Sequence, residues 1–372
     1  MKILHLNSNF VHSKLYGNQL NNMSVDFEHI IYNPIKQNVK VKDEGDPYTL
    51  FIPRNLNKLD SLLSFRRRHK SLKYLKRNLD LSEISLSHAH TLTNDGILAY
   101  SLFQKYNIPY VLTIRNTDVN FSIKYKKHLK PLFNKTIKSA ELIIFPNHVY
   151  KDKLMTLFKG NAEVEKKLEK SIVIPNGIDG YWHKNKKAER KTLENKKVID
   201  LIYVGRIYKN KNLHRVLKAI TEINEQKKYK LKFNVVGKVI NQKYFKNLKK
   251  NYKFKYFGTK NKEEISEIMK SMDIFTMPSE NETFGLVFLE ALSQNLPIVY
   301  TKDEGIDRYF SENVYGVAAH SKDYQDIKKA IIYIINNYNE MQKNLDDKEF
   351  LNEFKWETIG KKYDKIYREK CL

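Results

Sequence analysis

Short runs of β-branched and aromatic residues alternate along this chain with segments of helical length. The runs Leu201–Val204 and Phe233–Val236 are continuous and apolar, as strands buried on both faces of a parallel sheet should be. Amphipathic stretches such as Lys211–Gln226 and Lys262–Ser271 separate such runs. The alternation predicts βαβ units, and therefore an α/β fold with helices on both faces of parallel sheets.

The predicted strands and further helices can be assigned from the same pattern. The strands are Lys2–Leu6, Glu83–Ser87, Tyr110–Ile114, Glu141–Phe145, Ile172–Pro175, Asp200–Gly205, Leu231–Gly237, Phe254–Gly258, Asp273–Met277 and Pro297–Thr301. Further helices are expected at Asp95–Tyr106 and Gly285–Gln294, and an amphipathic tail at Phe354–Leu372. A length of 372 residues favours two domains. Turn residues at Ile174–Asp179, followed by a polar, Lys-rich stretch, place the break there, and we expect a cleft between two doubly wound domains.

The formal net charge of +25 is the most unusual bulk property. Basic residues cluster in Arg54–Arg77 and Phe121–Ala140. Such a field attracts phosphate in nucleic acid, anionic lipid headgroups or a pyrophosphate-linked acceptor, although a solvated Lys-rich surface explains it equally well. No recognisable nucleic-acid-binding motif accompanies the charge, so no specific nucleic-acid partner is expected.

The remaining bulk features favour a cytoplasmic protein. No apolar run is long enough for a transmembrane helix, and Met1–Leu6 reads as a first strand rather than a signal peptide. The single cysteine, Cys371, excludes a disulfide framework and a cysteine metal site.

Three segments of the second half carry groups suited to a sugar phosphate. Gly205-Arg206…Lys211 leads from a strand end into a helix, where the two cations could converge on a diphosphate, although such cations are common at helix starts. In the second segment a helix starts near Phe284 or Gly285, and its free N–H groups favour an anion. Asp303–Asp307 forms a further loop at a strand end.

Two carboxylates flank the start of the helix near Gly285. Glu282 precedes it, and Glu290 lies on the same helix face as Leu286, one turn further on. Carboxylates are poor phosphate ligands but good acceptors for sugar hydroxyls. Glu290 could be a solvated helix residue, but its apolar neighbours favour a partly buried carboxylate that needs partners.

Together these motifs resemble the GT-B glycosyltransferases of family GT4. The resemblance rests on Gly205-Arg206…Lys211, on Glu282-x7-Glu290 around Phe284-Gly285, and on Ile174–Asp179. It covers Ile172 to about Ala318 and the C-terminal helix, whereas the first half matches mainly in layout. It implies two Rossmann-like domains facing across a cleft: residues 1–178 bind the acceptor, residues 179–352 bind the nucleotide-sugar donor, and the helix at 353–372 crosses back to the first domain.

The resemblance also implies roles at the matching positions. Arg206 and Lys211 would neutralise the leaving diphosphate, Glu282 would hold hydroxyls of the donor sugar, and Glu290 would accept the ribose hydroxyls. Transfer would retain the anomeric configuration, without a metal ion, because the chain has no D-x-D motif, and without a cofactor. The implied donor-binding set is Gly17, Arg206, Lys211, Gly237, Phe257, Gly258, Glu282, Thr283, Phe284, Gly285, Leu286 and Glu290.

Two departures from the family pattern concern the first half. The usual Gly-Gly loop after the first strand is replaced by a stretch with one glycine, Gly17, which could still supply a positive φ. The usual histidine after Tyr110–Ile114 is replaced by Arg115, with Asn116 and Asp118 following. Arg115 cannot act as a base, but it could hold the donor phosphate or an acidic acceptor.

The first half also offers substitutes for the missing histidine. Asp118 would lie near the incoming hydroxyl, so that Glu282, Arg206, Lys211, Arg115 and Asp118 form the predicted catalytic set. His88 and His90 could replace the histidine, although a surface or core role is commoner for such residues. The predicted acceptor-binding residues are His90, Arg115 and Asn116.

The sequence therefore predicts transfer of a hexose-type sugar from a UDP- or GDP-sugar to a glycan or lipid-linked acceptor in cell-envelope polysaccharide synthesis. Basic segments suit peripheral contact with an anionic cytoplasmic membrane face, namely Arg66–Lys70 with Leu62, Leu63, Phe65 and Leu72, and Ile123–Ile137. The alternative is a non-catalytic sugar-nucleotide-binding partner of another glycosyltransferase. A phosphorylase would need a pyridoxal-bearing lysine and a longer chain, and no motif for one is present.

Overall fold

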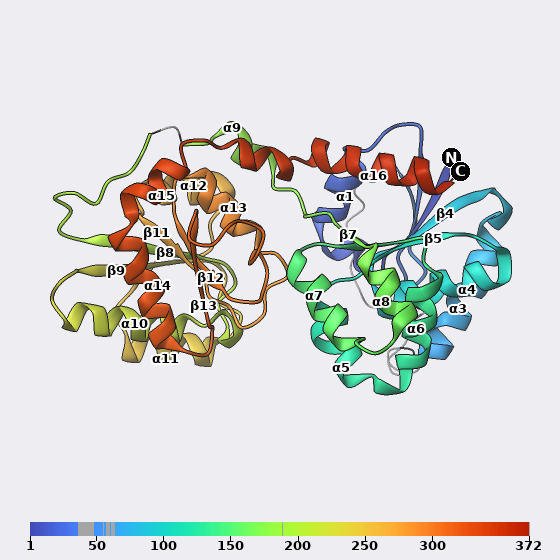
Figure 1. Ribbon diagram of the computed structural model, residues 1–372, viewed down its shortest axis with the longest axis horizontal. Helices are drawn as coiled ribbons and strands as arrows, with labels where there is room; N and C mark the ends of the chain where they lie inside the picture. Colours follow the sequence, from blue (N-terminus) through green and yellow to red (C-terminus); the bar gives the residue numbers. More distant parts are fainter. Residues whose placement is uncertain (36–47, 55, 57–59, 61–63, 188, 372) are drawn as a thin grey trace. The chain divides into compact units, whose positions relative to one another are not determined.

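The computed structural model describes residues 1–35, 48–54, 56, 60, 64–187 and 189–371 (Figure 1). Its contacts divide the chain into two compact units: unit 1 is Met1–Gly177 with Trp356–Leu372, and unit 2 is Ile178–Lys355. Among helices of the described residues, none has both the length and the apolar composition needed to cross a bilayer. Leu62 and Leu63, predicted to contact a membrane, lie outside the described residues.

Unit 1 is built on a seven-stranded sheet in the order β3-β2-β1-β4-β5-β6-β7, and every pair of neighbours runs parallel. Its strands are β1 (Lys2–Leu6), β2 (Glu28–Tyr32), β3 (Tyr48–Phe51), β4 (Ile84–Ala89), β5 (Tyr110–Thr113), β6 (Leu142–Phe145) and β7 (Ile172–Val173). The strand order reverses between β1 and β4: β2 and β3 extend the sheet on one side of β1, and β4 to β7 extend it on the other side. Ligands of doubly wound sheets bind at such a switch point, beyond the carboxyl ends of the strands.

Helices cover both faces of this sheet. They are α1 (Lys14–Leu20), α3 (Ser64–Asn78), α4 (Ile97–Tyr106), α5 (Ile123–Tyr125), α6 (Lys130–Ser139), α7 (His148–Leu157), α8 (Ala162–Glu169) and α16 (Trp356–Cys371). The C-terminal helix α16 belongs to unit 1, where Ile359 and Tyr363 pack on Ile3, Leu86 and Val111 of three different strands. Helix α16 therefore covers a sheet whose first strand, β1, begins at Lys2.

Unit 2 repeats this plan with a six-stranded parallel sheet in the order β10-β9-β8-β11-β12-β13. Its strands are β8 (Ile199–Val204), β9 (Leu231–Val236), β10 (Lys255–Tyr256), β11 (Ile274–Thr276), β12 (Ile298–Thr301) and β13 (Gly316–Ala319). Its helices are α9 (Gly180–Lys184), α10 (Leu213–Glu225), α11 (Gln242–Asn251), α12 (Lys262–Lys270), α13 (Leu286–Ser293), α14 (Tyr324–Asn336) and α15 (Tyr338–Asn344). The switch point lies between β8 and β11.

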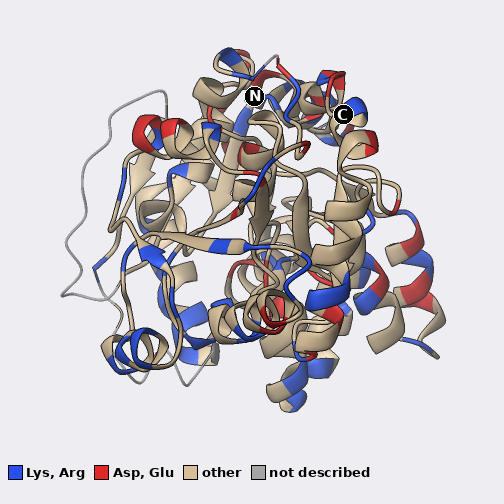
Figure 2. Cartoon of the chain, turned by 90° about the vertical axis from the view of Figure 1, so that its left-hand side faces the viewer, with Lys and Arg blue, Asp and Glu red and all other residues tan. Residues whose placement is uncertain are grey.

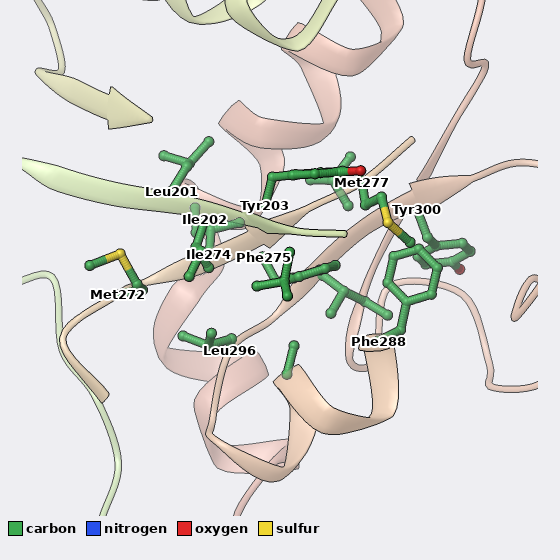
Figure 3. Close-up of a cluster of buried hydrophobic side chains, with 14 of the residues drawn as sticks. Leu201, Ile202, Tyr203, Met272, Ile274, Phe275, Met277, Phe288, Leu296 and Tyr300 are labelled. Carbon is green, nitrogen blue, oxygen red and sulfur yellow. The ribbon is translucent and has the colours of Figure 1, made fainter. Parts of the chain in front are cut away.

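The core of unit 2 holds α13 against the sheet. Phe288 of α13 packs edge-on against Phe275 of β11, with ring centroids 5.6 Å apart, and against Tyr300 of β12 at 6.4 Å (Figure 3). Both Phe275 and Phe288 are buried. Burying such rings is strongly favourable, so α13 is fixed on the sheet beside the switch point.

The α/β prediction is confirmed, and the predicted strands are present with shifts at their ends. Three strands were not predicted: β2, β3 and β13. β13 begins with Gly316 and continues with Val-Ala-Ala, so it lacks a run of strong β-formers, whereas β3 has such residues but is only four residues long and only partly buried.

The packing of α16 can be tested at Gly360. A Cβ at this position would lie 1.8 Å from the carbonyl oxygen of Asn22, in the segment that follows α1. Gly360→Ala should therefore displace α16 and lower the free energy of unfolding of unit 1 by about 2 kcal/mol. Gly180→Ala is the matched control, because a Cβ there meets nothing within 4 Å. Equal denaturant midpoints for the two variants would contradict the seating of α16.

Candidate functional site

Three glycines end neighbouring strands of unit 2 at its carboxyl edge. Gly205, Gly237 and Gly258 follow β8, β9 and β10, and all three have positive φ. The Gly237 N–H donates to the carbonyl of Gly258 at 2.7 Å, and a Cβ at Gly237 would lie 2.0 Å from the carbonyl oxygen of Gly205. Only glycine permits this close approach, which leaves an edge of exposed backbone beyond the strands.

Arg206 and Lys211 lie on the loop that leaves β8. Arg206 is exposed, and no described residue forms an ion pair with its guanidinium group. Its carbonyl accepts a hydrogen bond from the hydroxyl of Tyr203 at 2.8 Å, which fixes the backbone of the loop. Lys211 is mostly buried, and its Nζ lies 2.6 Å from Oε2 of Glu282. One predicted cation is thus free and the other is already paired.

The loop after β11 carries Glu282 towards Lys211. The Thr283 N–H donates to Oε1 of Glu282 at 3.1 Å, while Oε2 of Glu304 accepts from the Glu282 N–H at 3.3 Å. The next strand-end loop also approaches here, because a Cβ at Gly305 would meet Cγ of Glu282 at 3.2 Å. Loops that follow β8, β11 and β12 therefore converge on Glu282.

The N-terminus of α13 opens beside this loop. Gly285 is its N-cap, with φ +78, and no side chain caps the helix. A Cβ at Gly285 would meet the ring of Phe288 at 2.5 Å, so the position requires glycine on steric and conformational grounds. An uncapped first turn presents N–H groups that favour an anion. The Phe284 side chain is 1% exposed and packs in the core, so the predicted ligand contact at this position would be made by its backbone N–H.

Glu290 lies one turn along α13 and is only partly exposed. Burial raises its pKa to about 7, with the nearby Asp179 carboxylate adding to the effect. Asp179 is itself paired with Lys262 at 2.8 Å. Within the described residues, the Glu290 carboxylate has neither a hydrogen bond nor an ion pair. A partly buried carboxylate without a partner is costly, and ligand hydroxyls would remove that cost.

Asn212 was missed by sequence reasoning, yet it joins three loops of the site. It is buried, adopts φ +64, and its Nδ2 donates to the carbonyls of Pro278, at 3.0 Å, and of Ser321. Its Oδ1 accepts from Arg215 at 2.7 Å. The available signal was asparagine directly before a helix, since asparagine tolerates the left-handed region better than most residues.

The switch point of unit 1 is built around buried histidines. His5 of β1 shares hydrogen bonds with His90 and with His29 of β2, each at 3.0 Å. Burial lowers the pKa of His29 to about 4 and that of His88 to about 3, and it lowers the pKa of His5 and His90 well below the usual value. His90 is 2% exposed, so the prediction that its ring meets the acceptor does not fit this geometry.

Three of these residues, His5, His88 and His90, place ring nitrogens within 4.8 Å of one another and could hold a metal ion. The nitrogens of His88 already contact the hydroxyls of Thr113, at 2.8 Å, and Tyr367, at 2.5 Å. Both nitrogens of His5 contact other histidines. A metal ion would have to displace these hydrogen bonds, and a hydrogen-bonded core cluster is the simpler description.

Asp118 is also buried, and its oxygens are occupied. They accept hydrogen bonds from the N–H groups of Leu92 and Arg115, at 3.0 and 3.1 Å, and from the hydroxyl of Thr93 at 2.9 Å. The prediction that Asp118 lies beside an incoming hydroxyl does not fit this arrangement. The carboxylate instead ties the loop after β4 to the loop after β5.

Arg115 is held between these loops. Its Nε donates to the carbonyl of His90 at 3.2 Å, and its guanidinium lies 5.0 Å from the ring centroid of Tyr16. Asn116 accepts from Asn120 at 2.8 Å and remains partly exposed. Arg115 is partly exposed as well, so it and Asn116 are the predicted acceptor residues that ligand could reach.

Gly17 does not form a flexible loop. It lies inside helix α1, whose N-cap is Ser13, and it is not among the glycines with positive φ. The prediction that Gly17 supplies a positive φ is therefore wrong. The stretch after β1 turns directly into a helix because Ser13 accepts a hydrogen bond from the Leu15 N–H at 3.3 Å, as N-cap residues do.

Asp95 is a second residue that sequence reasoning missed in unit 1. It is buried and accepts from the N–H of Ser8 at 3.2 Å and from the hydroxyl of Thr91 at 2.9 Å. Burial raises its pKa to about 6. These bonds join the loops after β1 and β4, which diverge at the switch point.

Comparison with known proteins agrees with this architecture. The family described as Glycosyltransferase Family 4 matches residues 36–180, and the family described as Glycosyl transferases group 1 matches residues 184–349. This chain is a GT4-like glycosyltransferase. The GT-B fold, including the C-terminal helix that returns to the first unit, is confirmed.

Individual relatives are similar over most of their length. The uncharacterized glycosyltransferase MJ1178 of Methanocaldococcus jannaschii is 24% identical over 88% of this chain and 87% of its own. Alpha-monoglucosyldiacylglycerol synthase of Acholeplasma laidlawii is 24% identical over 80% and 78%. The crystal structure of Anabaena HepE in complex with UDP and glucose superposes with a TM-score of 0.68 at 17% identity, covering 99% of this chain and 100% of that one.

The buried histidines make the stability of unit 1 depend on pH. Their folded-state pKa values lie below the unfolded value of about 6.5, so their contribution is intact above that pH and is lost as pH falls. Lowering the pH from 7.5 to 5.5 should therefore lower the melting temperature of unit 1 more than that of unit 2, as scanning calorimetry would detect.

Substituting one histidine provides the control. His29→Gln should lessen the dependence on pH by the equivalent of one proton, because the glutamine does not titrate. Substituting the exposed His128 to Gln should leave the dependence unchanged. An unaltered pH profile in His29→Gln would show that this histidine does not couple folding to protonation.

Proposed function

We propose that this chain transfers a hexose-type sugar from a UDP- or GDP-sugar to a glycan or lipid-linked acceptor in cell-envelope polysaccharide synthesis, with retention of anomeric configuration. One observation carries the proposal: the Glu290 carboxylate lacks a partner among the described residues and lies on the uncapped helix α13. A helix end suited to an anion, next to a carboxylate suited to hydroxyls, matches a diphosphate joined to a ribose.

The donor diphosphate would lie between Arg206 and the first turn of α13. Arg206 is exposed and offers a fork of donors, while Lys211 adds a point charge from the same loop. Positive charge beside the leaving diphosphate stabilises the negative charge that develops as the sugar departs. In this proposal the two cations do that work without a divalent metal ion.

Glu282 would orient the donor sugar. Its ion pair with Lys211 at 2.6 Å fixes both side chains before the donor arrives. Lys211 can turn one of its three N–H bonds to phosphate while keeping another on Glu282. The second oxygen of Glu282, already near the Thr283 N–H, can then accept a sugar hydroxyl.

Unit 1 would bind the acceptor through Arg115 and Asn116. Arg115 is partly exposed and positively charged, which favours an acidic or phosphate-bearing acceptor. The relative from Acholeplasma is named for the synthesis of a glycolipid, which supports a lipid-linked acceptor here. The complexes of HepE with UDP and glucose support a UDP-sugar donor.

A nucleotide panel at two pH values tests the donor site. Thermal shift with UDP-, GDP- and ADP-sugars should stabilise the wild type with one nucleotide family, by about 2.7 kcal/mol at 100-fold excess over Kd. Because the pKa of Glu290 lies at about 7, its carboxylate is ionised at pH 8 and largely protonated at pH 6. The shift should therefore be larger at pH 8, since the ionised form accepts both ribose hydroxyls.

Glu290→Gln is the matched variant, because it keeps the shape and cannot ionise. It should bind several-fold more weakly at pH 8 and lose the difference between the two pH values, apart from the titration of the nucleotide itself. If no nucleotide sugar raised the melting temperature, the proposed donor site would be contradicted. Donor binding without hydrolysis or transfer by the isolated chain would favour the non-catalytic partner instead.

Peripheral membrane contact is part of the same proposal. Phe121 and Tyr125 are 57% and 72% exposed, and their rings lie 5.0 Å apart. Lys124, Lys126 and Lys127 lie in the same short segment. Exposed aromatic rings among lysines suit insertion at an anionic headgroup layer.

Vesicle flotation tests this contact. The wild type should float with vesicles that contain anionic lipid and not with neutral ones, and Phe121→Ser with Tyr125→Ser should reduce the bound fraction several-fold. Tyr333→Ser is the control, because Tyr333 is an exposed aromatic of unit 2. Flotation that does not depend on anionic lipid would exclude the contact.

A further inference from the structure

Unit 2 carries a large groove at the amino edge of its sheet, on the side opposite the donor loops. The groove encloses about 1480 Å³ and is lined by residues before and within β8, β9 and β10, by Phe257 directly after β10, and by residues of α10, α11 and α12. The donor glycines follow the same three strands at their carboxyl ends. Phe257 is the one predicted donor-binding residue among the described residues that line the groove, and the segments that carry Arg206, Glu282 and Glu290 do not line it.

The charge of this groove is strongly positive. Seven lysines line it, against the two acidic residues Asp200 and Glu225. The lysines are Lys197, Lys227, Lys228, Lys230, Lys232, Lys253 and Lys255. No carboxylate of the described residues forms an ion pair with any of these lysines, whereas other lysines of unit 2, such as Lys196 and Lys262, have carboxylate partners. Lys228 and Lys255 instead lie over the rings of Tyr229 and Phe257, at 5.1 and 4.6 Å from the ring centroids. Figure 2 shows the side of the chain that lies at the left of Figure 1, with Lys and Arg in blue and Asp and Glu in red.

The floor of the groove is apolar and aromatic. Phe233 and Leu217 are buried beneath it, and Tyr229, Tyr252 and Phe254 are partly buried along it. Partly buried rings offer faces or edges to a ligand that lies across them, and the C–H faces of sugar rings are suited to such contact. Lysines without carboxylate partners, above an apolar floor, suit a chain that carries both carboxylates and sugar rings.

We infer that this groove binds an anionic glycan chain, holding part of an acidic polysaccharide away from the reacting end. The choice of a glycan rests on the proposed function. Because a groove is recessed, a flat bilayer would not reach its floor. Arginine, which stacks on bases and grips phosphate with a fork of donors, is absent from the described residues that line it, so single-stranded nucleic acid is the less suitable occupant.

Calorimetric titration at low salt with an oligogalacturonate, an acidic oligosaccharide of about ten sugars, tests this inference. Lys228→Gln, Lys230→Gln and Lys232→Gln together should weaken binding about tenfold, because three exposed charge pairs are lost. The control carries Lys159→Gln, Lys166→Gln and Lys170→Gln, three exposed lysines of unit 1. It lowers the net charge equally and should retain the wild-type Kd. A neutral malto-oligosaccharide of equal length should bind far more weakly.

The other outcomes each overturn the inference. Equal weakening in the two triple variants would mean that only the overall charge attracts the glycan. An oligothymidylate that binds more tightly than the glycan, and loses that affinity in the groove variant, would assign the groove to nucleic acid. No binding of oligogalacturonate would leave the groove without this role. The thermal shift with nucleotide sugars, measured on the same samples, judges the donor site independently of all these results.

Discussion

Parallel pairing of every strand is the constraint on which the arrangement of functional groups depends. In a parallel sheet all carboxyl ends lie on one edge, so the loops after β8, β11 and β12 must emerge together. The reversal of strand order between β8 and β11 then separates neighbouring loops and leaves space between them. Arg206 and Lys211 share the loop after β8, and this edge brings them together with Glu282 from the distant loop after β11.

An ion pair and two hydrogen bonds hold these loops together. Lys211 and Glu282 form an ion pair in which both side chains are mostly buried. Removing one partner of such a pair leaves an uncompensated charge, which is far costlier than removing both. The buried Asn212 and its two carbonyl partners fix the same loops through neutral hydrogen bonds. The loops at this edge of unit 2 are therefore fixed where they meet, while Arg206 and Glu290 have no ion-pair partner among the described residues.

Sequence reasoning succeeded where one short segment carries its own signal. The apolar runs of β8 and β9 and the sequence around Gly285 specify buried strands and a helix start locally, so the fold class and the loops at the carboxyl edge of unit 2 were predictable. It failed where a residue's environment depends on distant segments. His90 and Asp118 follow strand ends, as functional residues do, but segments far along the chain bury them. The error at Gly17 is of another kind, because the signal was local: Ser13 caps a helix where a loop was expected.

Helix α16 has a consequence for how the protein is made. Unit 2 is one continuous segment, Ile178–Lys355, and can complete its core while synthesis is still in progress. Unit 1 cannot, because Ile359, Tyr363 and Tyr367 fill its core from α16, which is translated after all of unit 2. During translation its sheet therefore exposes the apolar residues Ile3, Leu86 and Val111 until α16 has left the ribosome. The nascent chain must be protected from aggregation during that interval, and a premature stop codon within α16 would make the exposure permanent.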